Sequence, residues 1–120
     1  MSKISVKATI KQNNEIQEEI ENKGILQNKK ITYLVNKQNS KTITILDIKK
    51  QIIKRITEEF DLIIDYKNEK LITDYIECQL DLDIKIIGRI IEQNRVKIKY
   101  KIEEDIFEYE IIWRNLWKRI

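Results

Sequence analysis

Hydrophobic and polar residues alternate one by one along most of this chain. In residues 3–11, KISVKATIK, isoleucine, valine and alanine take every second position, and lysine, serine and threonine take the others. Residues 60–66, 79–86, 95–102 and 106–113 repeat the pattern. Successive side chains of a β-strand point to opposite faces of a sheet, so a period of two predicts strands with one buried and one solvated face.

Two segments are ambiguous between strand and helix. In residues 13–24, Asn14 could cap a short helix that Gly24 ends, and in residues 47–60 apolar side chains recur every fourth position, which is a helical period. We predict strands for both. The second segment is rich in β-branched residues, and the strong strands on either side of it need a hairpin partner. Residues 113–120 could form a helical turn or two after the last strand.

Short polar breaks such as Asn13-Asn14 and Gln93-Asn94 separate the alternating runs. Their regular spacing is typical of consecutive antiparallel hairpins. We therefore predict an all-β fold, a single domain over residues 1–120 that forms an antiparallel up-and-down barrel of about 8–10 strands. The apolar faces of the runs should turn inward: Phe60, Leu62, Ile64, Leu80, Leu82, Ile84, Ile86, Val96, Ile98, Tyr100, Phe107, Tyr109 and Ile111.

The composition leaves few means of catalysis. There is no histidine, the commonest general base and metal ligand, and there are only two glycines, too few for a glycine-rich phosphate loop. Cys78 is the only cysteine, which excludes an internal disulfide, and we expect it to be a small buried or half-buried apolar residue. Asp81 and Asp83 share a strand face, as do Glu108 and Glu110, but both pairs oppose the apolar side. We therefore expect no enzymatic activity, no metal and no cofactor.

The charges suggest a solvated surface. The 23 basic and 20 acidic residues are interleaved, so the net charge of +3 forms no basic arm. Tyr100 lies on the strand face opposite Lys97, Lys99 and Lys101, so it cannot stack on a base beside them, and nucleic-acid binding is not expected. No apolar run approaches the length of a membrane span, and residues 1–7 lack the apolar stretch of a secretory signal. The expected location is the cytoplasm, with no membrane partner.

The order of these runs resembles the YwiB-like family, small bacterial proteins of unknown function. The resemblance extends over nearly the whole chain. It is carried by Gly24 before the third strand, by KTITI leading through QIIKR to Arg55, by the spacing Y-x-x-x-x-x-D-L-D-I from Tyr75 to Ile84, and by KIKYKI at residues 97–102. It implies a calycin-like, lipocalin-type β-barrel and no particular activity.

Arg55, Tyr100 and Tyr109 are the candidate ligand-binding residues. Arg55 could clamp an anion at the barrel mouth, or close the barrel end over an aromatic ring or a carboxylate such as Glu58. The inward tyrosine hydroxyls need partners that an aliphatic lining does not offer. The barrel could thus bind a small apolar or amphipathic ligand beside these residues. Alternatively the barrel is solid and its outer surface contacts RNA, a protein partner or a second copy of the chain.

Overall fold

The computed structural model describes residues 1–37 and 39–116, and all regular structure in these ranges is β-strand. The eleven strands are β1 (Ser2–Gln12), β2 (Glu15–Gln27), β3 (Lys30–Lys37), β4 (Ser40–Asp47), β5 (Ile52–Ile56), β6 (Phe60–Asp65), β7 (Lys70–Tyr75), β8 (Gln79–Asp83), β9 (Lys85–Glu92), β10 (Arg95–Ile102) and β11 (Asp105–Asn115). The predicted all-β class is confirmed, with slightly more strands than expected. Within the described ranges, no helix exists that could cross a membrane.

Both ambiguous segments are strands. The first forms most of β2, which bonds to β1 on one side and to β3 on the other. The second contains β5, which lies between β4 and β6. Pairing on both sides outweighs the local helical period in each case. The strand β11 continues to Asn115, so residues 113–115 of the expected helical tail are extended, and the part from Trp117 onward lies outside the described residues.

The strands form one antiparallel sheet in the order β8-β7-β6-β5-β4-β3-β2-β1-β11-β10-β9. Neighbours in this order are neighbours in sequence, except that β1 pairs with β11 and so joins the two ends of the chain. The strands β8 and β9 are the two edges of the sheet. They follow each other in sequence without forming a ladder between their described residues. The result is an up-and-down barrel that is nearly closed.

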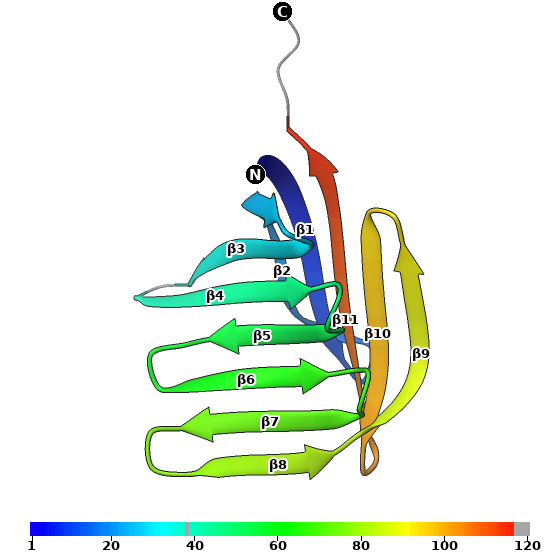
Figure 1. The fold of residues 1–120 in the computed structure, drawn as a ribbon. Coiled ribbons are helices and arrows are strands. Elements are labelled where there is room, and N and C mark those ends of the chain that lie inside the picture. The colour runs from blue at the N-terminus through cyan, green and yellow to red at the C-terminus, as the bar shows by residue number, and fades with distance from the viewer. Residues whose placement is uncertain (38, 117–120) are drawn as a thin grey trace, which may run out of the picture.

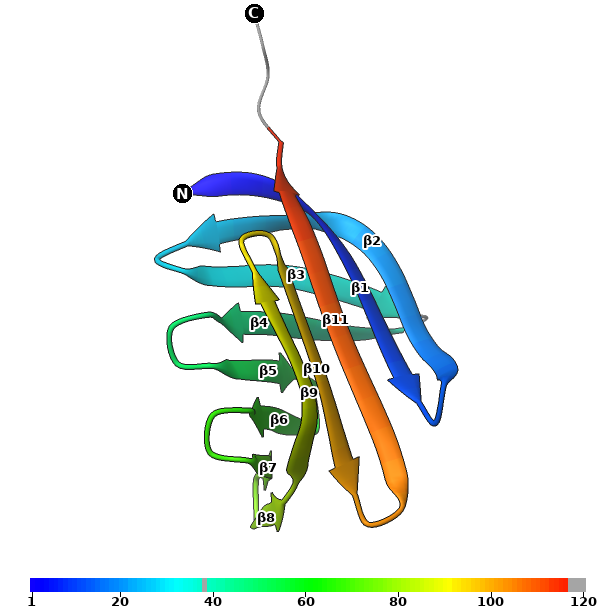
Figure 2. The ribbon, with the colours of Figure 1, turned by 90° about the vertical axis from the view of Figure 1, so that its right-hand side faces the viewer.

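Figures 1 and 2 show how the sheet folds into two layers. Strands β3 to β8 form one layer, and β9, β10, β11 and β1 cross behind it at a steep angle. The strand β2 takes part in both, because it pairs with β1 along its length but with β3 only over residues 24–27. Gly24 allows this divergence. A Cβ at that position would lie 2.7 Å from the Thr32 carbonyl oxygen and 3.0 Å from Cγ2 of Val6.

The core lies between the two layers. The predicted inward faces are largely confirmed: Ile64, Ile84, Val96, Ile98, Tyr100, Tyr109 and Ile111 are buried, and Phe60, Leu62, Ile86 and Phe107 are half-buried. Leu80 and Leu82 are the exceptions. Their ladder partners Thr73 and Leu71 place them on the inner side of the sheet, yet they remain 54% and 49% exposed because β8 is an edge with little packed across from it. The expected burial of Cys78 was wrong, since it is exposed in the turn before β8.

Backbone and side-chain contacts hold the two layers together where β8 turns into β9. The backbone carbonyl of Glu69 accepts a hydrogen bond from the Ile84 amide, and its carboxylate accepts one from the Ile86 amide, each at 3.1 Å. Arg89 of β9 donates to the Tyr66 carbonyl at 2.6 Å and lies over the Tyr66 ring. These contacts join the two layers near the turn from β8 to β9, and we call this junction the seam. Away from that turn, the junction between the two layers is more open.

Candidate ligand-binding site

We call the layer of β3 to β8 the front layer and the layer of β9, β10, β11 and β1 the rear layer. One row of side chains crosses the front layer. The ladders place its members opposite one another on successive strands: Tyr33 on β3, Thr44 on β4, Arg55 on β5, Leu62 on β6, Thr73 on β7 and Leu80 on β8. Tyr33 and Thr44 are buried, so the row faces the interior. Arg55 lies two residues after the fully buried Ile53 on the same strand. The alternation that turns Ile53 into the core therefore turns Arg55 inward as well.

A second row crosses the rear layer and meets the first. Its members are Glu18 on β2, Ile10 on β1, Tyr109 on β11 and Ile98 on β10. Nη2 of Arg55 donates to both carboxylate oxygens of Glu18, at 3.0 and 3.2 Å. The hydroxyls of Tyr33 and Tyr109 share a hydrogen bond of 3.1 Å, and the Arg55 guanidinium carbon lies 6.0 Å from the centre of the Tyr109 ring. Each polar contact joins the front layer to the rear layer.

Burial controls the protonation of this cluster. Desolvation raises the pKa of the Tyr33 and Tyr109 phenols above the ordinary value, and it raises the pKa of Tyr100 to about 12. Burial by itself would lower the pKa of Arg55, but the adjacent Tyr109 and Glu18 outweigh it and raise that pKa. At neutral pH the cluster therefore consists of neutral hydroxyls around one guanidinium and its carboxylate partner.

Several polar atoms of the cluster have no hydrogen-bond partner among the described residues. Nε of Arg55 is buried and makes no hydrogen bond to the described protein, whereas the hydroxyl of the fully buried Thr44 lies close enough to the Tyr33 and Tyr109 hydroxyls to affect their pKa. Nη1 of Arg55 and the hydroxyl of Tyr100 make no hydrogen bond to the described protein either, but they are not among its fully buried atoms. Buried polar groups are normally satisfied, so such a concentration beside one ion pair is unusual. The cluster offers more hydrogen-bond donors than the protein itself uses.

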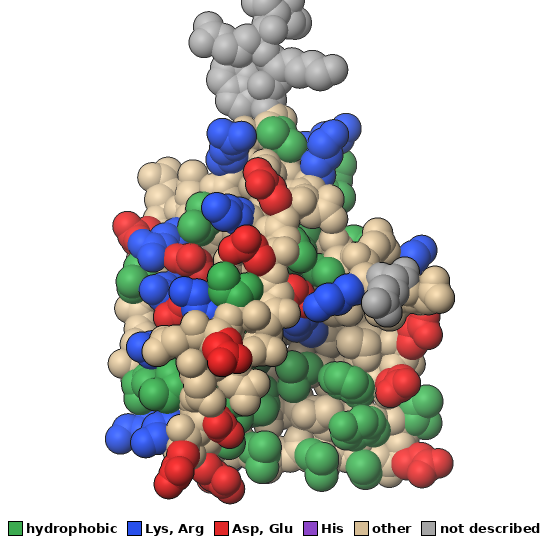
Figure 3. All heavy atoms as spheres, turned by 180° about the vertical axis from the view of Figure 1, so that it is seen from behind, with side chains coloured by type: hydrophobic (Ala, Val, Ile, Leu, Met, Phe, Trp, Pro, Cys, Tyr) green, Lys and Arg blue, Asp and Glu red, His purple; other side chains and the backbone are tan. Residues whose placement is uncertain are grey.

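The front row leads from this cluster to an uncovered apolar surface. We call it the open inner face: the inward side chains of β6, β7 and β8 at Phe60, Leu62, Tyr75, Leu80 and Leu82. Exposure rises along the sheet, from Ile53 and Ile64, which are buried, to Leu82 at the edge. Figure 3 shows hydrophobic side chains gathered at the lower right, over this part of the front layer seen from inside. Arg55 stands between the packed half of the interior and the open half.

A surface groove lies elsewhere, on the outer side of β1 to β4. It has a volume of about 840 Å³, and Ile25, Leu34, Ile43 and Leu116 supply much of its lining. Tyr33 is the member of the polar cluster that also belongs to its lining. The groove offers apolar surface but none of the paired charges of the interior. We take the polar cluster and the open inner face, where an ion pair adjoins apolar side chains, as the candidate site.

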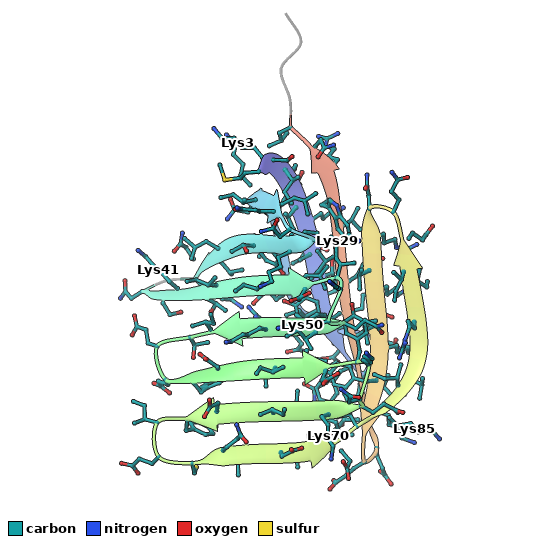
Figure 4. All side chains as sticks on the ribbon, viewed as in Figure 1. Lys3, Lys29, Lys41, Lys50, Lys70 and Lys85 are labelled. Carbon is teal, nitrogen blue, oxygen red and sulfur yellow. The ribbon has the colours of Figure 1, made fainter. Side chains whose placement is uncertain are left out.

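On the outer surface, basic side chains form ion pairs with neighbouring acidic ones. Glu108 accepts ion pairs from Lys11 and Lys97, and Arg95 is paired with Glu110 and Glu92. The six lysines labelled in Figure 4 lie on separate strands and turns around the molecule. No concentrated basic patch comparable to a nucleic-acid groove is evident among these residues.

The structure brings the three sequence-predicted site residues into one cluster. Arg55 and Tyr109 are in contact, and Tyr100 is close enough for both to influence its pKa. The carboxylate partner of Arg55 is Glu18, so the suggested pairing with Glu58 was wrong. Sequence analysis missed Glu18, Tyr33 and Thr44. Glu18 could have been found, because it is in phase with the inward Ile20 once residues 15–27 are read as a strand.

The fold and its internal polar cluster define a small up-and-down β-barrel protein. No family model matches the chain, and no curated protein matches it. It is similar to a solved structure, the crystal structure of the YwiB protein from Bacillus subtilis, with a TM-score of 0.61 and 14% sequence identity over 96% of this chain and 91% of that chain. The YwiB-like barrel predicted from the sequence is thus confirmed as a fold. At this identity the likeness carries no activity or ligand.

Proposed function

We propose that this protein is a non-enzymatic binding protein that holds one small amphipathic molecule between its two layers. The apolar body of the molecule lies on the open inner face, and its polar head lies at Arg55, Tyr100 and Tyr109. The observation that carries the proposal is the ladder row in which unpaired donors of Arg55 adjoin Leu62 and then the exposed Leu80. Ligand pockets commonly combine an apolar lining with a few convergent polar groups.

The arrangement fits binding better than chemistry. The cluster has one carboxylate, already paired with the arginine, and its tyrosines are held in the neutral form. Catalysis by general acid and base needs groups that exchange protons near neutral pH, which phenols with a raised pKa do not. In the described part of the chain, no three acidic or cysteine side chains are grouped as a metal site.

The test is a fluorescence titration with N-phenyl-1-naphthylamine, a neutral apolar probe that brightens when it leaves water. We expect saturable binding of one probe per chain. Leu82→Gln should weaken it by about fivefold, because a partly covered leucine contributes roughly 1 kcal/mol of apolar contact. Ile90→Gln is the matched control, since Ile90 is also an exposed apolar residue of an edge strand but faces outward beside Lys97. Equal effects of the two substitutions, or no saturable binding, would refute the proposal.

Native mass spectrometry of the protein purified from its own host gives a second test. A retained small molecule should be lost, or reduced several-fold, in Tyr100→Phe, which removes a hydroxyl without a protein partner. The same substitution should leave the fold intact, because the phenyl ring keeps its packing against Phe107, at a centroid distance of 5.3 Å in the wild type. Undiminished retention would remove Tyr100 from the site.

A further inference from the structure

The charge balance of the polar cluster specifies what kind of head group the interior accepts. Arg55 and Glu18 are both largely buried, with side chains 15% and 13% exposed, and their charges cancel. Another cation that faces the interior is Arg89, an exposed residue of the edge strand β9. It is already committed to the Tyr66 carbonyl and ring at the seam. The Arg55–Glu18 pair therefore brings no spare positive charge to the open inner face.

An anionic head group would leave this cluster with a net negative charge. It would also stand near a carboxylate that is fixed on β2 and bonded to Arg55 through both oxygens. Displacing Glu18 would not help, because Glu18 would then be a partly buried carboxylate without its partner. Two like charges within a few ångströms in a partly desolvated site repel by several kcal/mol even at an effective dielectric constant of about 20. Anions are thus disfavoured at the site.

A neutral acceptor meets no such penalty. The free Nη1 group of Arg55 can donate hydrogen bonds, and so can the Tyr100 hydroxyl. An amide, ester or ketone oxygen would accept these bonds without changing the charge of the cluster. Such a head group would also replace the water that the apolar body displaces from Arg55, so no donor would be left newly unsatisfied.

We propose that Glu18 is a specificity-determining residue that makes the interior select amphiphiles with a neutral, hydrogen-bond-accepting head over the corresponding anions. This inference rests on the proposed function, since it concerns the same site. Glu18 acts by neutralising the charge of Arg55. The arginine can then still donate hydrogen bonds to a head group, but it offers no net positive charge to an anion.

The experiment compares decanamide with decanoate, which share a chain and differ in head-group charge, as competitors of N-phenyl-1-naphthylamine at pH 8. In the wild type, decanamide should bind at least about tenfold more tightly than decanoate. In Glu18→Gln the loss of one negative charge should tighten decanoate by about tenfold or more and change decanamide by less than about twofold. Glu19→Gln is the matched control, because it makes the same change of net charge on an exposed residue of the outer face, and it should alter neither affinity.

The possible results separate the two proposals. If decanoate binds the wild type as tightly as decanamide, the selectivity inference is overturned while the binding function stands. Equal tightening of decanoate in Glu18→Gln and Glu19→Gln would likewise overturn it, since the effect would then come from overall charge. If neither competitor displaces the probe and no probe binds, the proposed function itself fails. Should Glu18→Gln not fold, the wild-type comparison still tests the inference, because equal affinities for decanamide and decanoate overturn it.

Discussion

Replacing Arg55 by methionine should lower the free energy of unfolding by about 3 kcal/mol, because it leaves Glu18 as an unpaired carboxylate inside the barrel. Removing one partner of a buried ion pair costs roughly 3–5 kcal/mol. The 15% and 13% exposure of the two side chains places this pair at the lower end of that range. Methionine keeps most of the apolar volume of the arginine stem, so the change reports on charge more than on packing.

The double substitution Arg55→Met/Glu18→Met should recover most of this loss. A buried ion pair replaced by apolar residues of similar volume is often neutral for stability, since both desolvation costs disappear together. We expect the double variant within about 1 kcal/mol of the wild type, and hence at least about 2 kcal/mol more stable than Arg55→Met alone. Arg95→Met provides the surface control. Its partner Glu110 is bonded at 2.8 Å but Arg95 is on the surface, where solvent screens the pair, and we expect a much smaller loss than for Arg55→Met.

Urea denaturation followed by circular dichroism measures these differences. For a domain of this size the slope of free energy against urea is about 1–3 kcal/mol per molar, so a loss of 3 kcal/mol moves the midpoint by about 1–3 M. The reasoning would be refuted if Arg55→Met cost no more than Arg95→Met. It would also be refuted if the double variant were as unstable as Arg55→Met, because the unpaired charge of Glu18 would then not be the cause of the lost stability.

Three further outcomes follow from the same structure. Stability should fall as the pH rises through about 10–12, because folding raises the pKa of buried tyrosines. Their contribution to stability is complete below the ordinary phenol pKa and is lost above it, by about 1.4 kcal/mol at pH 11 for a phenol whose pKa is raised to about 12. Absorbance at 295 nm should show the phenols of Tyr66 and Tyr100 ionising together with unfolding, and their ionisation in a folded protein near pH 10 would contradict this. Gly24→Ala should cost about 1–3 kcal/mol in a thermal melt, because the new Cβ would lie 2.7 Å from a backbone carbonyl oxygen. Gly88→Ala should cost clearly less, because its nearest contact is Cβ of Lys99 at 3.3 Å, and equal losses would contradict the close-packing argument. Deleting residues 106–120 should abolish cooperative unfolding, since β11 joins β1 to β10, and a truncated chain that melts sharply would show that this junction is dispensable.

The period-two pattern was sufficient to predict the class of fold because this barrel has one inner and one outer side along almost its whole length. Residues such as Val96, Ile98 and Tyr100 alternate with lysines, and all three are buried. The same pattern could not predict how well each inner side chain is covered. Leu80 and Leu82 continue the alternation perfectly, but coverage depends on what lies across the barrel, and at the edge strand β8 little does.

Part of the candidate site could be predicted from the sequence. Arg55 stands out as a charge in phase with Ile53, and the tyrosines stand out as hydroxyls on apolar faces. Glu18 was missed although the strand predicted over residues 13–24 places it on one face with Ile16 and Ile20, because a glutamate between two isoleucines does not by itself mark a binding residue. In the structure, β2 shifts register opposite Ile10 and Lys11, so Ile16 falls on the outer side while Glu18 and Ile20 face inward. A bulge of this kind reverses the phase of a strand and leaves no clear signal in a single sequence.

The location of the ion pair connects the architecture to the proposed selectivity. A fully packed interior would be at least as stable with apolar side chains in place of Arg55 and Glu18, so packing alone does not explain their presence. They lie where the covered part of the interior gives way to the open inner face, and there water can reach Nη1 of Arg55 while Nη2 remains bonded to Glu18. A molecule that covers the open inner face removes that water. Its affinity therefore depends on whether its own polar atom replaces the lost hydrogen bond without adding a charge, which is the property that the comparison of decanamide with decanoate measures.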